Sequence, residues 1–207
     1  MGSEQVIYSV HESLVRASSP FFDKAMAGEW KESAQRTVQL PDVDVEIFAL
    51  YAHWLYCGTL PVIGERRDWT GTMEYLHLAK AYVLGDRLLD TKFQNAVIDA
   101  IVEKSQTAAR GGTDRPCLDV IRYTYQSTAE SATIRDLLVD VYICHGTSTW
   151  LSSWPDPSPI PEPFLLKLAS KLLDGQKVSI TTHKYYSQAV QPVKRGRFSG
   201  RLSSLRR

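Results

Sequence analysis

The sequence predicts an α+β fold, in which a cluster of helices surrounds a small sheet. Residues 5–11 and 37–40 alternate in side-chain character and are rich in β-forming residue types, as short strands are. Between and after them, apolar residues recur at steps of three and four, the period of helices that bury one face. Strands interrupted by several helices, without an internal repeat, favour this class over a parallel doubly wound sheet.

The first predicted elements are a strand and a short helix. The strand covers residues 5–11, and residues 12–17 follow it with one or two helical turns. We expect this helix to place Leu14 and Val15 inward, against the rest of the core.

A second helix is predicted to begin at a serine and proline pair. Ser19 is a good N-cap and Pro20 suits the first helical position, so the helix should run from there to about Ala27. The second strand, residues 37–40, ends at Pro41, which cannot donate a hydrogen bond to a neighbouring strand.

The most strongly apolar helix is predicted between Asp44, a good N-cap, and Gly58, which ends it. Its apolar residues recur at helical steps over a wide face, so we expect it to be central to the core. They are Ile47, Phe48, Leu50, Tyr51, Trp54 and Leu55.

Two further helices are predicted to meet at a tight turn. The first covers residues 72–84 and is ended by Gly85. Asp86 then caps the second, whose apolar residues continue the helical period as far as Val102.

The second half of the chain predicts a helical region between a polar linker and a basic tail. Residues 105–116 have the composition of a linker, and residues 175–207 that of a mobile tail. Helices are predicted over residues 117–127, 133–145 and 162–174, with an irregular stretch of five prolines over residues 150–163.

Composition is that of an ordinary globular protein, with 43% hydrophobic and 23% charged residues. No apolar run approaches the roughly 20 residues needed to span a bilayer, and the first residues do not resemble a secretion signal, so we expect no membrane association. The three widely spaced cysteines indicate reduced thiols rather than a disulfide framework. A cytoplasmic or nuclear location, or both, is therefore expected.

Several blocks of the sequence share both letters and spacing with one protein family. The similarity spans about residues 5–104, which resemble the BTB/POZ domain. The blocks are Val10–Leu14 (V-H-x-x-L), Ser18–Phe22 (S-x-Y/F-F), Trp30–Ser33 (F-K-E-S), Val38–Asp44 (L-P-D-x-D), Trp54–Leu60 (l-Y-t-G-x-l) and Leu78–Gly85, which is similar to the closing helical pair of the family.

The resemblance implies a domain organisation. Residues 1–104 are identified as a BTB/POZ domain that lacks the family's usual first strand, followed by the linker over 105–116. Residues 117–174 resemble the helical extension common in fungal BTB proteins, and the basic tail covers 175–207. The family binds other proteins and is not enzymatic, so we expect a non-catalytic interaction module without a cofactor.

Two residues are candidates for partner binding. Trp30 and Glu32 lie where cullin-binding members of the family carry a hydrophobic-x-Glu motif, which implies a substrate adaptor for a cullin-type ubiquitin ligase. The alternative is that this segment only ends a helix and leads into the next strand. A second alternative function is a homodimeric scaffold in a nuclear complex, associating through residues 12–17 and the missing strand.

The basic tail offers a further interpretation. Six cations and no acid occupy residues 194–207, and Lys194, Arg195 and Arg197 are candidates for a nuclear signal or for nucleic-acid contacts. Solvated disorder is the favoured alternative, because only Phe198 could stack on a base.

No catalytic, cofactor-binding or metal-binding residue is predicted. His11 has no nucleophile motif beside it and is better explained by a structural hydrogen bond. His53 and Cys57 stand four residues apart but lack two further metal ligands at a suitable spacing. The aromatic residues Phe48, Tyr51, Trp54 and Tyr56 are most simply explained as core. An enzyme of unrecognised type stays a remote third alternative, which would need titratable groups converging in a cleft.

Overall fold

The computed structural model describes residues 6–28, 31–60, 71–109, 115–152, 159–175 and 177–188. These residues form helices joined by loops and turns, without a strand among them. In chain order the elements are α1 (Glu12–Ser18), α2 (Pro20–Met26), α3 (Lys31–Gln35), α4 (Val45–Cys57), α5 (Gly71–Arg87), α6 (Thr91–Ala109), α7 (Leu118–Ser127), α8 (Thr133–His145), α9 (Ser148–Ser152), α10 (Glu162–Leu173) and the 3-10 helix η2 (Thr182–Tyr185).

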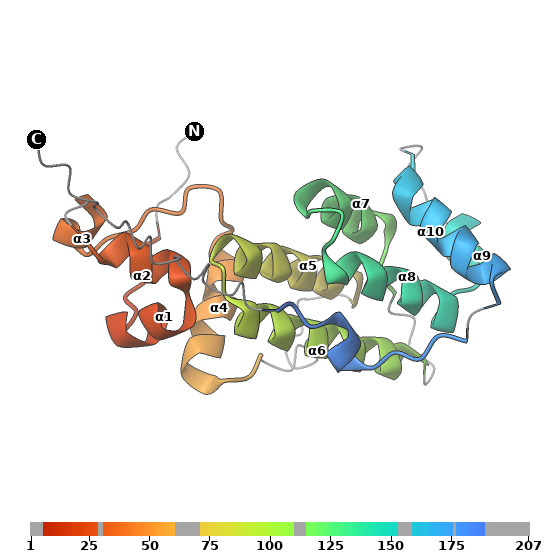
Figure 1. Ribbon diagram of the computed structural model, residues 1–207, viewed down its shortest axis with the longest axis horizontal. Coiled ribbons are helices and arrows are strands. Elements are labelled where there is room, and N and C mark those ends of the chain that lie inside the picture. The colour runs from red at the N-terminus through yellow and green to blue at the C-terminus, as the bar shows by residue number, and fades with distance from the viewer. Residues whose placement is uncertain are drawn as a thin grey trace, which may run out of the picture.

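The two longest helices form the middle of an elongated molecule (Figure 1). Helices α5 and α6 pack side by side, with α1 to α4 at one end of the pair and α7 to α10 toward the other. The segment that contains η2 runs back along α6 toward the N-terminal helices.

The small sheet predicted from the sequence is not found among the described residues. Residues 6–10 and 37–40, where strands were expected, are neither strand nor helix. The first segment instead packs on α4 through its side chains: the Tyr8 hydroxyl donates to the carbonyl of Val45 at 3.1 Å, and the Tyr8 and Phe48 ring centroids lie 5.0 Å apart. A strand requires a second backbone as its hydrogen-bonding partner, and the described part of the chain supplies none here.

The predicted start of α2 is confirmed, whereas the predicted burial of α1 residues is only half right. The Ser19 hydroxyl accepts a hydrogen bond from the backbone N–H of Phe22, and the following proline is the first residue of α2. On α1, Val15 is buried as predicted, but Leu14 is exposed. Adjacent positions on a helix point about 100° apart, so a helix this short buries only one of the two.

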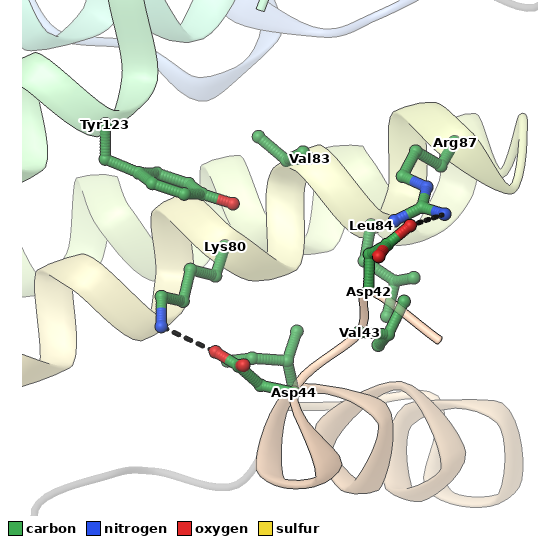
Figure 2. Close-up of a pocket in the computed structure, with 9 residues that line it drawn as sticks. Asp42, Val43, Asp44, Lys80, Val83, Leu84, Arg87 and Tyr123 are labelled. Atoms are coloured by element: carbon green, nitrogen blue, oxygen red, sulfur yellow. Dashed lines mark hydrogen bonds and ion pairs between the residues drawn. The ribbon is translucent and has the colours of Figure 1, made fainter. Parts of the chain in front are cut away.

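The first turn of α4 is stabilised by a longer-range contact than the predicted one. Asp44 occupies the N-cap position, but its side chain caps no backbone N–H. Its carboxylate instead accepts a hydrogen bond from Lys80 on α5 at 2.5 Å (Figure 2). Gly58 ends α4 in the left-handed conformation, with φ of 71°, as its position in the sequence predicted.

The turn between α5 and α6 differs from the prediction. Helix α5 continues through Gly85, where a Cβ atom would lie 2.7 Å from the side chain of Gln94 on α6. The glycine therefore permits close packing of the two helices instead of ending the first. Asp90, not Asp86, caps α6, because its carboxylate accepts the backbone N–H of Phe93 at 3.0 Å.

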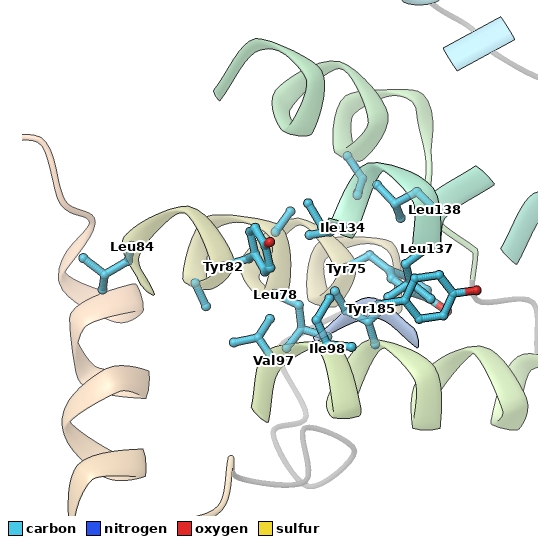
Figure 3. Packing of buried hydrophobic residues seen from close by; sticks show 14 of the residues in the cluster. Tyr75, Leu78, Tyr82, Leu84, Val97, Ile98, Ile134, Leu137, Leu138 and Tyr185 are labelled. Carbon is cyan, nitrogen blue, oxygen red and sulfur yellow. The ribbon is translucent and has the colours of Figure 1, made fainter. Parts of the chain in front are cut away.

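One hydrophobic core runs through both halves of the described chain (Figure 3). Helix α6 extends to Ala109, into the predicted linker, and α7 and α8 pack directly on α5 and α6. The helical extension is therefore continuous with the N-terminal helices and has no separate core. Residues that meet in this core include Leu78, Tyr82, Val97, Ile98, Ile134, Leu137 and Tyr185.

The segment after the last α-helix is fastened to the body. Tyr185 is buried, and its carbonyl accepts a hydrogen bond from the Thr133 hydroxyl at 2.6 Å. The backbone N–H of Ser187 donates to the Asn95 side chain at 2.8 Å. The mobile tail predicted to follow α10 therefore does not include residues 177–188.

A buried carboxylate joins α8, α10 and the η2 segment. Asp140 has no exposed surface and accepts hydrogen bonds from Lys171, Lys184 and the Tyr185 hydroxyl, each at 2.6 Å. Burial alone would raise the pKa of Asp140, but these donors outweigh it and hold the pKa below its ordinary value of 3.8.

Replacing Asp140 with asparagine should lower the free energy of unfolding by about 2 to 3 kcal/mol at neutral pH, because two lysines lose their carboxylate. A carboxylate with a lowered pKa stabilises the fold above its unfolded value and stops doing so as the pH falls through its folded value. The difference between wild type and Asp140→Asn should therefore be constant above the ordinary pKa of 3.8 and shrink below it. Urea unfolding at several pH values measures this difference, with the exposed Asp174→Asn as control. A difference that stays constant into strong acid would contradict the assignment.

Candidate functional site

The structure places one of the predicted site residues on a described surface. Glu32 lies in α3, and its side chain is exposed. Trp30 lies outside the described residues, as do Lys194, Arg195 and Arg197 of the basic tail. The site can therefore be built from Glu32 and the residues around it.

Glu32 borders a shallow groove of about 300 Å³, which we call the Glu32 groove. Its lining combines apolar side chains with one carboxylate and one ammonium group. The lining residues are Phe21, Lys24 and Ala25 from α2, Glu32 from α3, and Leu89 from the turn between α5 and α6. Three separate elements thus converge on a surface that offers apolar contact and opposite charges together.

Helix α3 is held in place beside the groove by contacts with α1 and α2. The Ser33 hydroxyl donates to the carbonyl of Met26 at 3.0 Å, which ties α3 to the end of α2. Arg36, just after α3, pairs with Glu12 of α1 at 2.6 Å. The hydrogen bond from Arg16 is the largest cause that lowers the pKa of Glu12; desolvation opposes it, and the charges of Arg36 and Arg16 lower the pKa further. These contacts orient the short helix on which Glu32 stands.

The far wall of the groove depends on Asp90, which is fully buried. Its carboxylate accepts hydrogen bonds from the hydroxyl of Ser18 at 2.5 Å and from that of Tyr51 at 3.0 Å, in addition to capping α6. Burial, followed by the charge of Asp90, raises the pKa of Tyr51. The Asp90 network therefore joins the end of α1, the middle of α4 and the start of α6.

Leu89 is held between two fixed neighbours and adopts a strained backbone conformation. Its φ is 55°, a left-handed value that costs a residue with a Cβ atom about 1 to 2 kcal/mol. On one side lies Asp90, and on the other the carbonyl of Leu88 accepts a hydrogen bond from the Ser19 hydroxyl at 2.6 Å. The Leu89 side chain is nonetheless 48% exposed, in the groove. Backbone strain of this kind persists only where the surrounding structure holds the residue in place, as the contacts of Leu88 and Asp90 do here.

Sequence reasoning missed the contribution of Leu89. The predicted motif supplied Glu32 alone, because the groove forms only when the turn before α6 packs on α2. The signal available in the sequence was the Ser18-Ser19 pair, whose hydroxyl groups position this turn through Asp90 and Leu88.

A second pocket, of about 200 Å³, lies between the loop before α4 and helices α5 and α7 (Figure 2). Its charged groups pair with one another: Lys80 with Asp44 at 2.5 Å, and Arg87 with Asp42 at 3.9 Å. Tyr123 of α7 covers one side. Because each cation already faces a carboxylate, its charged groups are engaged with one another, and we take the Glu32 groove as the candidate site.

His11, which was expected to make a structural hydrogen bond, contacts Tyr56. The His11 ring nitrogen Nδ1 lies 2.7 Å from the Tyr56 hydroxyl, which also accepts the His11 backbone N–H at 3.0 Å. Tyr56 is thus an exposed partner of His11 and does not belong to the core, contrary to the prediction. The Cys57 sulfur lies 3.9 Å from His53. Within the described ranges, no group of three or more His, Cys, Asp or Glu could hold a metal, and no helix is long and apolar enough to cross a bilayer.

Replacing Leu89 with asparagine should leave the free energy of unfolding within about 0.5 kcal/mol of wild type. Asparagine tolerates positive φ, so relief of backbone strain offsets the lost burial of a half-exposed leucine. The buried neighbour provides the contrast, because Leu88→Asn should cost about 3 kcal/mol or more. Chemical denaturation of the two variants checks this, and an equal loss for both would show that Leu89 is an ordinary core residue.

Comparison with known proteins is informative at the level of the domain. Neither the curated proteins nor the solved structures contain a match to the chain. A family model does match, and its matched region contains α1 to α5 together with every residue that lines the Glu32 groove. The likeness to fungal relatives and to their helical extension stays a prediction. Over residues 2–90, the chain is similar to the BTB/POZ domain, a family of protein-interaction modules.

Proposed function

We propose that the chain is a BTB/POZ-type adaptor that binds a cullin-type ubiquitin-ligase scaffold through the Glu32 groove. The observation that carries this proposal is an exposed carboxylate, on a tethered helix, beside an apolar groove within the matched region. Residues 1–104 would supply the docking surface, and the helical extension would enlarge the body that other proteins contact.

The groove has the two features that a specific protein contact needs. An apolar side chain of the partner can pack on Phe21 and Leu89, which releases ordered water from both surfaces. Glu32 and Lys24 then supply one acceptor and one donor at the edge, which fix the orientation of the partner. Because α3 is already tethered, little conformational freedom is lost on binding.

Trp30 supports the same proposal from the sequence. It lies two residues before Glu32, so the chain carries a tryptophan and a carboxylate at hydrophobic-x-Glu spacing. Tryptophan is enriched among the residues that dominate the energy of protein interfaces.

Binding of the full chain to an N-terminal cullin fragment, followed by titration calorimetry, tests the proposal. Glu32→Ala should weaken the complex about 30-fold, because it removes the oriented acceptor at the edge of the groove. Trp30→Ala should weaken it by a similar factor. The matched control is Glu130→Ala, which removes an exposed glutamate from the loop before α8 and should leave the affinity unchanged. Failure of the wild-type chain to bind any cullin fragment would remove the ligase assignment.

A second candidate function, a homodimeric scaffold, is favoured by the N-terminal segment. Ile7 is 90% exposed, and Leu14 of α1 is also exposed on the same end of the molecule. Residues 6–10 have a strand-like sequence without a ladder partner in the described part of the chain. Pairing with the same segment of a second copy would supply that partner and form the predicted sheet between copies. The basic residues Lys194, Arg195 and Arg197 would then serve nuclear targeting.

Replacing both Ile7 and Leu14 with lysine should abolish association at micromolar concentration, because each substitution places a charge in the apolar contact. Light scattering would report twice the chain mass of 23.3 kDa for wild type and a single chain for the variant. Met73→Lys, at another exposed apolar position, on α5, is the control and should remain dimeric. A wild-type protein that scatters as one chain would end this second candidate.

A further inference from the structure

Helix α10 has apolar side chains on two opposite faces. Its inner face packs on the core through Phe164 and Leu168, which are buried. The lysines of α10 pair with carboxylates of α8, Lys167 with Asp136 and Lys171 with Asp140. These two charged side chains therefore face α8 and do not cover the outer face of the helix.

The outer face is consequently apolar and exposed. Successive helical residues are about 100° apart, which places positions 166, 169 and 173 opposite the buried Phe164. A contiguous exposed apolar patch of this kind marks an interaction surface. We call this patch the outer leucine stripe; it contains Leu165 (37% exposed), Leu166 (59%), Leu172 (57%), Leu173 (87%) and the exposed Ala169.

The outer leucine stripe is symmetric about Ala169. Counting outward from this residue, the leucine pair 165 and 166 on one side mirrors the pair 172 and 173 on the other. When two such helices pack antiparallel, each leucine pair meets the opposite pair of the second copy. A two-fold interface requires a patch that is complementary to itself, and this sequence meets that requirement. Ala169 at the crossing point lets the two helices approach closely.

The charges near α10 favour the antiparallel orientation. Glu162 begins the helix, whereas Asp174 and Lys177 follow its end, and all three are exposed. Antiparallel packing brings Lys177 of one copy to the same end as Glu162 of the other, although Asp174 also lies there. A parallel arrangement would bring the two Glu162 side chains together and align the helix dipoles unfavourably.

We propose that two copies of this chain associate through antiparallel packing of their α10 helices. Helix α10 lies toward the opposite end of the molecule from α3, so this pairing leaves the Glu32 groove open (Figure 1). The dimer presents two Glu32 grooves at once, which raises the apparent affinity for a partner that carries two copies of the matching surface.

The size of the surface sets the strength of the association. The 12 residues of α10 form a helix about 18 Å long. One face of so short a helix buries less surface than the roughly 800 Å² per partner of a standard stable interface. The dissociation constant should therefore be on the order of 10⁻⁴ M, well above that of a permanent dimer.

Sedimentation equilibrium of the full chain, from about 10 to about 500 µM, measures this association. The variants carry Ile7→Lys and Leu14→Lys throughout, so that association through the N-terminal segment does not contribute. In this background the chain should dimerise at the high end of the range. Adding Leu166→Lys or Leu173→Glu should raise the dissociation constant at least about tenfold. Adding Met73→Lys, at an exposed apolar position on α5, should not change it.

Mixing two variants tests the orientation. Antiparallel packing places position 166 of one copy opposite the 172 and 173 pair of the other, so a mixture of Leu166→Lys and Leu173→Glu should restore the dimer. A mixture of Leu166→Lys and Leu166→Glu should not, because those positions meet only in a parallel pair. Both sites are well exposed, and thermal unfolding of each variant confirms that the fold is intact.

A chain that sediments at 23.3 kDa over the whole range overturns the proposal. Rescue by the Leu166→Lys and Leu166→Glu mixture instead overturns the antiparallel arrangement. Because Glu32→Ala leaves α10 unchanged, loss of cullin binding and loss of dimerisation are observed independently of each other.

Discussion

The buried carboxylate of Asp90 holds together the parts of the chain that build the candidate site. It accepts hydrogen bonds from Ser18 at the end of α1, from Tyr51 in α4 and from the first turn of α6. A buried charge is tolerated only where several donors replace the water it has lost. The position of Leu89, and with it one wall of the Glu32 groove, follows from this requirement because the residues on both sides of Leu89 are fixed.

The sequence predicted correctly those helix ends that depend on residues close together in the chain. The start of α2 at Ser19 and Pro20 and the end of α4 at Gly58 depend on capping chemistry within a few residues, and both are confirmed. Gly85 and Asp86 were assigned to the wrong roles because the α6 helix packs against Gly85, a contact between helices that no local pattern reveals. The expected strands illustrate the same limit, since a strand depends on a partner that its own residues do not specify.

The candidate site was predictable to a similar extent. Glu32 could be singled out from its motif. The apolar residues beside its carboxylate, however, come from α2 and from Leu89, and Leu89 is more than fifty residues from Glu32 in the sequence. The shared core of α5, α6 and α8 was likewise hidden by a polar stretch typical of a linker. One consequence is a single elongated body with distinct surfaces near its two ends: an amphipathic groove at one, and the outer leucine stripe toward the other.

Amide hydrogen exchange of the full chain, with and without an N-terminal cullin fragment, tests the central claim most directly. If the Glu32 groove is the docking surface, exchange should slow in α2, in α3 and in the turn between α5 and α6, while α10 is unaffected. A complex that forms without slowing exchange in these segments, or that protects only α7 to α10, would contradict the account.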